Sequence, residues 1–393
     1  MVNIIDYLKK YGNVSFKDES FNELDAAIFA RLSYIDFSKF IKAKKYFSKK
    51  SLTKVAANIL ALQDSSRFKL KEDNILLQEV TNSTRYKNIY VFAYVKDTNQ
   101  AKVKQFSAIS FISKDKSGNF LIISFRGTDG TYTGWKEDFE MCYKPFIPSQ
   151  KESEKYAKKL TRFSMKKKII LVGHSKGGNL AVYSSIFLNP KKVQSVYTFD
   201  SPGFNKSFLN EEGFKRIKDK IIAFAPQTSI IGRLLYQDYP ITIVDSEKAL
   251  FNQHNLYNWN VEEVQFKRLD KFTYLSNKID DVVKHNLEKL SYDEKVEFVE
   301  SLFGIIKEMS KDDVIQFEDN LWSFFLRFNK ILKTKSEETK KLIYSIFKKD
   351  KNNEPIKRIE PLKNKDSKIK GFFSRFKKEK RDIPDIIENE IDN

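Results

Sequence analysis

The sequence GHSKG at residues 173–177 combines residue types that could carry out covalent catalysis. A serine between two such glycines, placed where a strand passes into a helix, lies on a turn too tight for larger side chains. Here the apolar run IILV precedes the motif and GGNLA opens a helix after it. A chance glycine-rich turn is the alternative, but only 13 glycines occur in 393 residues, which makes the pattern rare by chance. The motif therefore predicts that Ser175 is a nucleophile.

A serine hydroxyl becomes a good nucleophile only when a base removes its proton, and the chain has three histidines. His174 adjoins Ser175 and is expected to pack or to hydrogen-bond under the turn. His285 lies in a predicted helix, DDVVKHNLEKL, and is expected to be exposed. His254 lies in NQHNLYNW, a loop-like segment after the last predicted strand of the sheet. Because α/β-hydrolases place their histidine on a late loop after the serine, we predict that His254 is the base.

Three aspartates could orient the histidine. Asp200 ends the strand SVYTFD directly after the nucleophile helix, at the edge of the sheet where sites of this class lie. Asp245 ends the strand YPITIVD, and Asp238 lies just before that strand. Each could instead cap a turn, which is the commoner role of an aspartate at a strand end. We favour Asp200, because the Ser-Pro-Gly that follows it would hold its backbone in place.

Two backbone amides are the expected hydrogen-bond donors to the oxyanion of a tetrahedral intermediate. The first is the amide of Lys176, the residue after the nucleophile. The second is predicted in the turn FRGTD at residues 125–129, which ends a buried strand at the same edge of the sheet. Gly127 would let the chain turn so that the amide of Thr128 faces the serine. A plain strand-end turn would also explain Gly127, although not the arginine and Trp135 nearby.

The elements that must position these residues alternate as in an α/β fold. Three strands rich in β-branched and aromatic residues are predicted at 88–97, 104–115 and 119–127, the first two forming a hairpin. From about residue 152 helices and short apolar strands alternate. This alternation predicts a mostly parallel sheet flanked by helices on both faces.

Three regions are expected along the chain. Residues 1–262 would form the α/β domain with an N-terminal helical segment, in which Leu24, Ile28 and Leu32 recur at helical spacing after Asn22 or Ser20 as a cap. Residues 263–350 lack strand signals and show helical periodicity, so they would form a helical extension. Residues 351–393 are rich in Lys, Asn, Asp and Glu, a composition typical of a flexible tail.

Composition narrows the classes of function. The net charge of +19 comes without a recognised nucleic-acid motif, so a nucleic-acid partner is not expected. Three histidines and the single Cys142 leave no pattern for a metal site, and we expect no cofactor. The opening residues lack the apolar run of a secretory signal, and no stretch approaches the roughly 20 apolar residues of a membrane span. We therefore expect a cytoplasmic protein.

The tail sequence KIKGFFSRFKK at 368–378 interleaves phenylalanines with basic residues. Such a segment could make a peripheral contact with an anionic membrane, with its rings in the interface and its lysines near the headgroups. The alternative is a solvated lysine-rich tail. We favour the solvated tail slightly, because Gly371 weakens a helix and the acidic end DIPDIIENEIDN opposes the basic charge.

Several ordered motifs resemble the Mbeg1-like branch of the lipase class 3 superfamily. They are FRGTDGTYTGW with the DF that follows it, GHSKGGNLA, YTFDSPGFN, IIAFAPQTSIIGRLL and QHNLYNW. The segment FNELDAAIFARLSYIDF is similar to that branch's N-terminal region, so the resemblance covers about residues 15–310. It implies an α/β-hydrolase fold, a nucleophile at Ser175, a histidine at His254, and oxyanion amides at Thr128 and Lys176.

The chain departs from class 3 lipases at the acid. Those lipases carry it in an Asp-Ile/Val-Pro segment, whereas the matching stretch here, PQTSI at 226–230, has no carboxylate. Asp200 is similar in placement to the acid of pancreatic-type lipases, which follows the preceding strand. The resemblance thus leaves Asp200 as the expected third member of the site.

These residues predict a serine hydrolase that cleaves a carboxylic ester, with an acyl ester or lipid as substrate. Amide, thioester or acyl-transfer chemistry would use the same groups. The alternative is a catalytically inactive hydrolase-like protein that serves as a binding or membrane-associated module, which the missing class 3 carboxylate favours. Against that alternative, the serine, the histidine and the glycines of the turn are all present.

Overall fold

The computed structural model describes residues 2–43, 46, 48–114, 118–162, 167–248, 250–309 and 328–347. Within these ranges no helix is both long and apolar enough to cross a membrane. The tail expected at 351–393, with the basic segment 368–378, lies outside the described residues.

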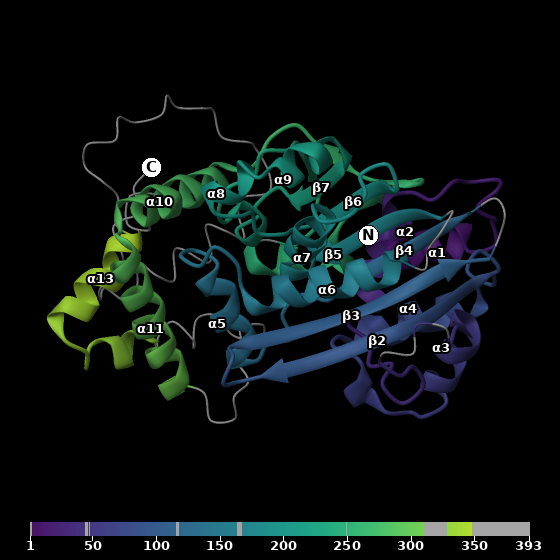
Figure 1. The fold of residues 1–393 in the computed structure, drawn as a ribbon, viewed down its shortest axis with the longest axis horizontal. Helices are drawn as coiled ribbons and strands as arrows, with labels where there is room; N and C mark the ends of the chain where they lie inside the picture. Colours follow the sequence, from purple (N-terminus) through teal and green to yellow (C-terminus); the bar gives the residue numbers. More distant parts are fainter. Residues whose placement is uncertain are drawn as a thin grey trace.

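A mixed sheet forms the centre of the molecule (Figure 1), with nine strands in the described ranges in the order β1-β2-β3-β4-β5-β6-β7-β8-β11. Neighbouring strands from β4 to β8 run parallel, and the outer pairs on both sides are antiparallel. The strands are β1 (Lys50–Ser51), β2 (Ile89–Asn99), β3 (Lys104–Ser113), β4 (Phe120–Phe125), β5 (Lys168–His174), β6 (Val193–Phe199), β7 (Ile221–Pro226), β8 (Ile241–Val244) and β11 (Arg268–Leu269).

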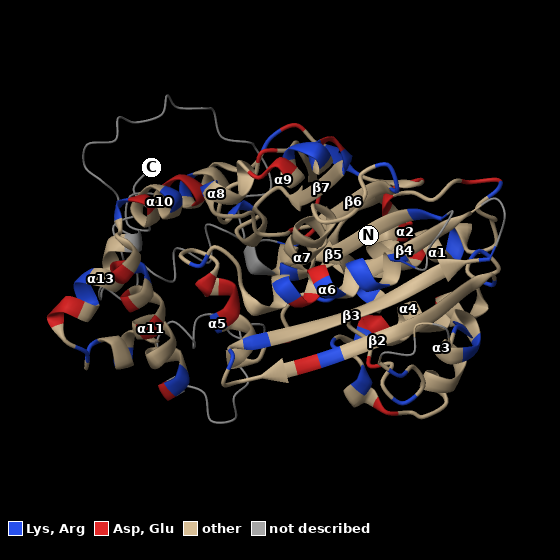
Figure 2. Cartoon of the chain, in the orientation of Figure 1, with Lys and Arg blue, Asp and Glu red and all other residues tan. Residues whose placement is uncertain are grey.

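Apolar residues on both faces explain why the central strands lie inside the molecule. Every residue of β4 is buried, and β5 is buried from its second residue onward. In β5, Ile170 and Val172 pack on one face, and Ile169 and Leu171 on the other. The predicted hairpin of the first two strands is confirmed as the antiparallel pair β2 and β3. Their charged residues gather toward the hairpin end (Figure 2), so the middle of the pair stays apolar.

Helices cover each face of the sheet. One face packs against the N-terminal helices α1 (Ile4–Tyr11), α2 (Glu23–Leu32), α3 (Leu52–Leu60) and α4 (Lys71–Asn82). The other packs against α6 (Pro148–Arg162), α7 (Lys176–Ser185) and α9 (Glu212–Ile217). The predicted α/β-hydrolase fold, with a largely parallel central sheet between helices, is thus confirmed.

The N-terminal segment forms part of the main core. Helix α2 begins after Asn22, whose side chain accepts hydrogen bonds from two backbone amides of the first turn, so the predicted cap is confirmed. Leu24, Ile28 and Leu32 are fully buried, as their spacing predicted. A buried ion pair of 2.6 Å between Arg85 and Asp25 joins this helix to the segment that precedes β2.

A helical extension follows the sheet, with α10 (Tyr274–Lys289), α11 (Tyr292–Met309) and α13 (Glu337–Phe347). It lies beyond the carboxyl ends of β4 and β5, beside α5 (Tyr132–Glu140) (Figure 1). The ring of Phe303 on α11 packs edge-on against Tyr132 and Phe139 of α5, at centroid distances of 5.6 and 5.3 Å. The extension therefore covers the helix that follows the 125–129 turn.

The expectation that residues after 262 lack strands is wrong. Strand β10 (Gln265–Phe266) pairs with β9 (Val261–Glu262), and β11 adds to the edge of the main sheet beside β8. Strands of two residues are too short to produce a hydrophobic period, so the sequence pattern gave no sign of them.

Candidate active site

Ser175 lies on the sharp turn between β5 and α7, with φ 58° and ψ −136°. An L-residue in that region of backbone space is strained, and such strain persists where the surrounding structure enforces it. A Cβ on Gly173 would lie 2.1 Å from the carbonyl carbon of Gly177, and one on Gly177 would lie 2.1 Å from the carbonyl oxygen of Phe125. The turn therefore admits only glycine at both positions, as its sequence suggested.

His254 and Asp200 are in direct contact. The Nδ1 atom of His254 lies 2.6 Å from Oδ2 of Asp200, which is buried directly after β6. With Nδ1–H donating to the carboxylate, the lone pair on Nε2 is the one that can accept a proton. The structure thus brings together the predicted base and the favoured acid, 54 residues apart in the chain.

The other two candidate acids lie in different environments. Asp238 pairs with Lys218 at 2.8 Å on the surface. Asp245 is buried, where its carboxylate lies 3.0 Å from the amide of Asn260 and 3.4 Å from the ammonium of Lys267. Both have partners that explain them without a histidine.

His285, the third histidine, lies in α10 and is half-buried, so the expectation of an exposed residue is wrong. Helix α10 packs against α13, and the sequence pattern alone does not predict that packing.

His174 forms two hydrogen bonds beneath the turn, as expected. Its Nε2 lies 2.7 Å from the backbone carbonyl oxygen of His254, and its Nδ1 lies 2.9 Å from the hydroxyl of Tyr34. Burial, together with the nearby His254 ring and Arg31, lowers the pKa of His174 well below its usual value. The neutral ring then donates from Nε2 to the His254 carbonyl and accepts from Tyr34. Tyr34, which the sequence reasoning missed, thus indirectly supports the backbone of His254.

The buried His174 should make the protein sensitive to acid. Only the unfolded chain takes up a proton on this ring below its ordinary pKa of about 6.5, so its contribution lowers the free energy of unfolding there by up to about 1.4 kcal/mol per pH unit. We expect His174→Gln, which keeps a donor and an acceptor, to lose less stability between pH 7 and pH 5 than the wild type. Urea denaturation across that range measures this. Equal pH dependence in both proteins would contradict the assignment of a neutral ring.

The two predicted oxyanion residues share a carboxylate. The hydroxyl of Thr128 donates to Oδ2 of Asp138, and the ammonium of Lys176 lies 3.2 Å from Oδ1 of Asp138 and 3.0 Å from Glu137. A Cβ on Gly127 would lie 2.9 Å from the Cβ of Ser175, so the 125–129 turn packs directly against the nucleophile. The structure therefore gathers both residues beside the serine.

Burial and neighbouring charges shift the pKa values of Asp138 and Lys176 in opposite directions. Burial raises the pKa of Asp138 to about 6, although Lys176 opposes the shift. Burial alone would lower the pKa of Lys176, but Asp138 and Glu137 raise it. The sequence analysis assigned no role to Glu137 or Asp138. Asp138 could have been recognised, because it is the aspartate of the DF that follows the FRGTDGTYTGW motif.

Lys176→Met should strongly destabilise the protein, because it leaves the buried carboxylate of Glu137 without its cation. Breaking one side of a buried ion pair costs about 3–5 kcal/mol of unfolding free energy. Lys155→Met is the matched control, since Lys155 pairs with Glu152 at the surface and its loss should cost less than about 1 kcal/mol. Urea denaturation compares the two variants, and an equal loss in both would contradict the buried pair.

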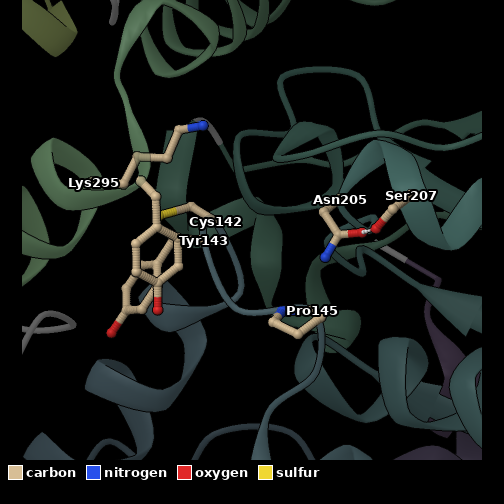
Figure 3. A pocket seen from close by; sticks show the side chains of 7 residues that line it. Cys142, Tyr143, Pro145, Asn205, Ser207 and Lys295 are labelled. Atoms are coloured by element: carbon tan, nitrogen blue, oxygen red, sulfur yellow. Dashed lines mark hydrogen bonds between the residues drawn. The ribbon is translucent and has the colours of Figure 1, made fainter.

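A cavity of about 270 Å³ lies near the end of α5 (Figure 3). Its walls come from the α5–α6 connection, the residues around α8 (Lys206–Leu209), and α11. The lining residues are Cys142, Tyr143, Pro145, Asn205, Ser207, Tyr292 and Lys295. Burial raises the pKa of Cys142 to about 12, which keeps its thiol protonated and therefore a poor nucleophile. Across the described ranges no group of three or more His, Cys, Asp and Glu side chains could hold a metal ion.

The comparison with family models agrees with the resemblance seen in the motifs. The family model described as Mbeg1-like matches residues 80–304, more than half of the chain. Lipase II from Rhizopus niveus is a similar solved structure, with a TM-score of 0.37, 16% identity, and coverage of 65% of this chain and 88% of that one. Lip2 lipase from Yarrowia lipolytica is another similar solved structure, with a TM-score of 0.34, 11% identity, and coverage of 56% of this chain and 77% of that one. No curated protein matches the chain in sequence.

The matched region begins before β2 and ends within α11, so it contains Ser175, Asp200 and His254 together with both predicted oxyanion residues. The chain belongs to the Mbeg1-like family.

Proposed function

We propose that this protein is a serine hydrolase that cleaves a carboxylic ester through an acyl-enzyme on Ser175. The single observation that carries the proposal is the 2.6 Å contact between His254 and Asp200, since it orders an imidazole in the tautomer that serves as a base. The strained turn at Ser175 and the glycines around it support the same reading.

In the proposed reaction, the Oγ of Ser175 attacks the ester carbonyl while Nε2 of His254 takes the hydroxyl proton. The carboxylate of Asp200 holds Nδ1–H and stabilises the imidazolium that forms. The amides of Thr128 and Lys176 donate to the oxyanion. His254 then gives its proton to the departing alcohol, and a water activated by the same imidazole hydrolyses the acyl-enzyme.

The proposed substrate class is an acyl or lipid ester. An alkoxide is a better leaving group than an amine anion, so this set of groups cleaves an ester with less demand on the proton transfer than an amide. A peripheral contact with an anionic membrane through residues 368–378, which lie outside the described residues, stays a prediction. A cytoplasmic location likewise stays a prediction.

The rival function is a hydrolase-like module that binds without turnover. Its support in the sequence is the missing carboxylate in residues 226–230. Because Asp200 already contacts His254 from the neighbouring strand, that absence does not leave the histidine without an acid.

Labelling by a fluorophosphonate probe separates the two functions, because only an activated serine reacts with it. We expect the native wild-type protein to be labelled at Ser175, and the heat-denatured protein and Ser175→Ala to remain unlabelled. Mass spectrometry of the labelled peptide identifies the site. A folded wild-type protein that fails to react would favour the binding module.

A further inference from the structure

Ser229 lies in the loop that follows β7, beside the acid of the proposed site. In the structure the Oγ of this serine lies 2.5 Å from Oδ1 of Asp200. One oxygen of this carboxylate thus contacts Ser229 and the other contacts His254.

The hydroxyl of Ser229 and one backbone amide fix the orientation of Asp200. The N–H of Gly232 donates to the same Oδ1 at 3.0 Å, and also lies 3.0 Å from the Oγ of Ser229. With both donors on Oδ1, the carboxylate plane is set so that Oδ2 faces Nδ1 of His254. Asp200 and Ser229 are both buried, so water does not replace a lost donor easily.

Helix α10 holds this loop in place. The Oγ of Ser276 donates to the backbone carbonyl of Ser229 at 2.5 Å, and the N–H of Thr273 donates to the carbonyl of Gln227 at 2.8 Å. An ion pair of 2.6 Å between Arg233 and Asp280 closes the other end of the loop. The backbone of Ser229 is therefore held by α10 on the side away from Asp200. A residue that orients another side chain must itself be held in place.

We infer that Ser229 is a positioning residue that holds the carboxylate of Asp200 in the orientation required by His254. This inference rests on the proposed function.

The first test compares Ser229→Ala with Ser229→Thr. Loss of one hydrogen bond to a charged group should lower kcat by about 10-fold or more, with KM changed less than about 2-fold, and threonine should restore kcat. Ser246→Ala is the matched control, because Ser246 is another buried serine whose hydroxyl donates to a backbone carbonyl, at 2.9 Å. A Ser229→Ala protein with the kcat of the wild type would overturn the positioning role.

A readout without turnover separates this inference from the proposed function. The Nδ1 proton of His254, hydrogen-bonded to a carboxylate, gives a strongly downfield proton NMR signal. We expect that signal in the wild type and in Ser229→Thr, its loss in Asp200→Ser, and its weakening in Ser229→Ala. If these signals follow expectation in a protein that cleaves no ester, the proposed function fails while the inference stands. An unchanged signal in Ser229→Ala would overturn the inference even in an active enzyme.

Discussion

Replacing Ser175 by alanine should lower the hydrolysis of a short-chain nitrophenyl ester by about 10⁴-fold or more, while the protein stays folded. The change removes the one oxygen that would form the acyl-enzyme. Alanine keeps the Cβ that the turn already accommodates at φ 58°, so the backbone needs no rearrangement. Initial rates at saturating ester, with circular dichroism of each protein, measure activity and fold separately.

Ser195→Ala is the control for this result, because Ser195 is a buried serine of β6 with no part in the proposed chemistry. Its activity should match that of the wild type. Retained hydrolysis in Ser175→Ala would remove Ser175 from the mechanism.

Asp200→Asn should lower kcat by about 10²–10⁴-fold. The reason lies in the donors around Asp200: Ser229 and the amide of Gly232 both point at Oδ1, so the carbonyl oxygen of an asparagine would face them. Its NH₂ group would then face Nδ1 of His254 and force the proton onto Nε2, which is the wrong tautomer for a base. Steady-state kinetics on the same ester provide the measurement.

Asp238→Asn and Asp245→Asn test whether the acid was chosen correctly. Both carboxylates have partners of their own, so kcat should change little in either variant. If either of them loses more activity than Asp200→Asn, the acid lies elsewhere.

The sequence predicted those parts of the site whose signal is local. The strand, the turn and the helix around Ser175 lie within one short stretch of sequence. The apolar run, the glycines and the serine could therefore be recognised together. His254 followed by elimination, because the chain has three histidines. Asp200 was favoured over two rivals by its place at the end of a strand, and the sheet then brought it to His254 through β6.

The supporting residues could not be predicted because their partners are distant in the chain. Tyr34 lies 140 residues before the His174 that it contacts, and nothing in the sequence around it marks a role in the site. In the sequence, residues 226–230 were notable only because they lack a carboxylate, and Ser229 itself was given no role. Asp138 belonged to a recognised motif, but its bond to Thr128 depends on how α5 folds back over the turn.

The placement of the helical extension has a consequence for protein synthesis. A ribosome that has made residues 1–262 has already produced Ser175, Asp200 and His254. It has not yet made α10, which holds the Ser229 loop, or α11, whose Glu300 pairs with Lys136 of α5 at 2.7 Å. Domains fold as the chain emerges, N-terminal parts first. The ribosome thus synthesises the three catalytic candidates before it synthesises the helices that contact both sides of the site. A chain stalled between residue 262 and α10 would contain Ser175, Asp200 and His254 but would lack the contacts from α10 and α11.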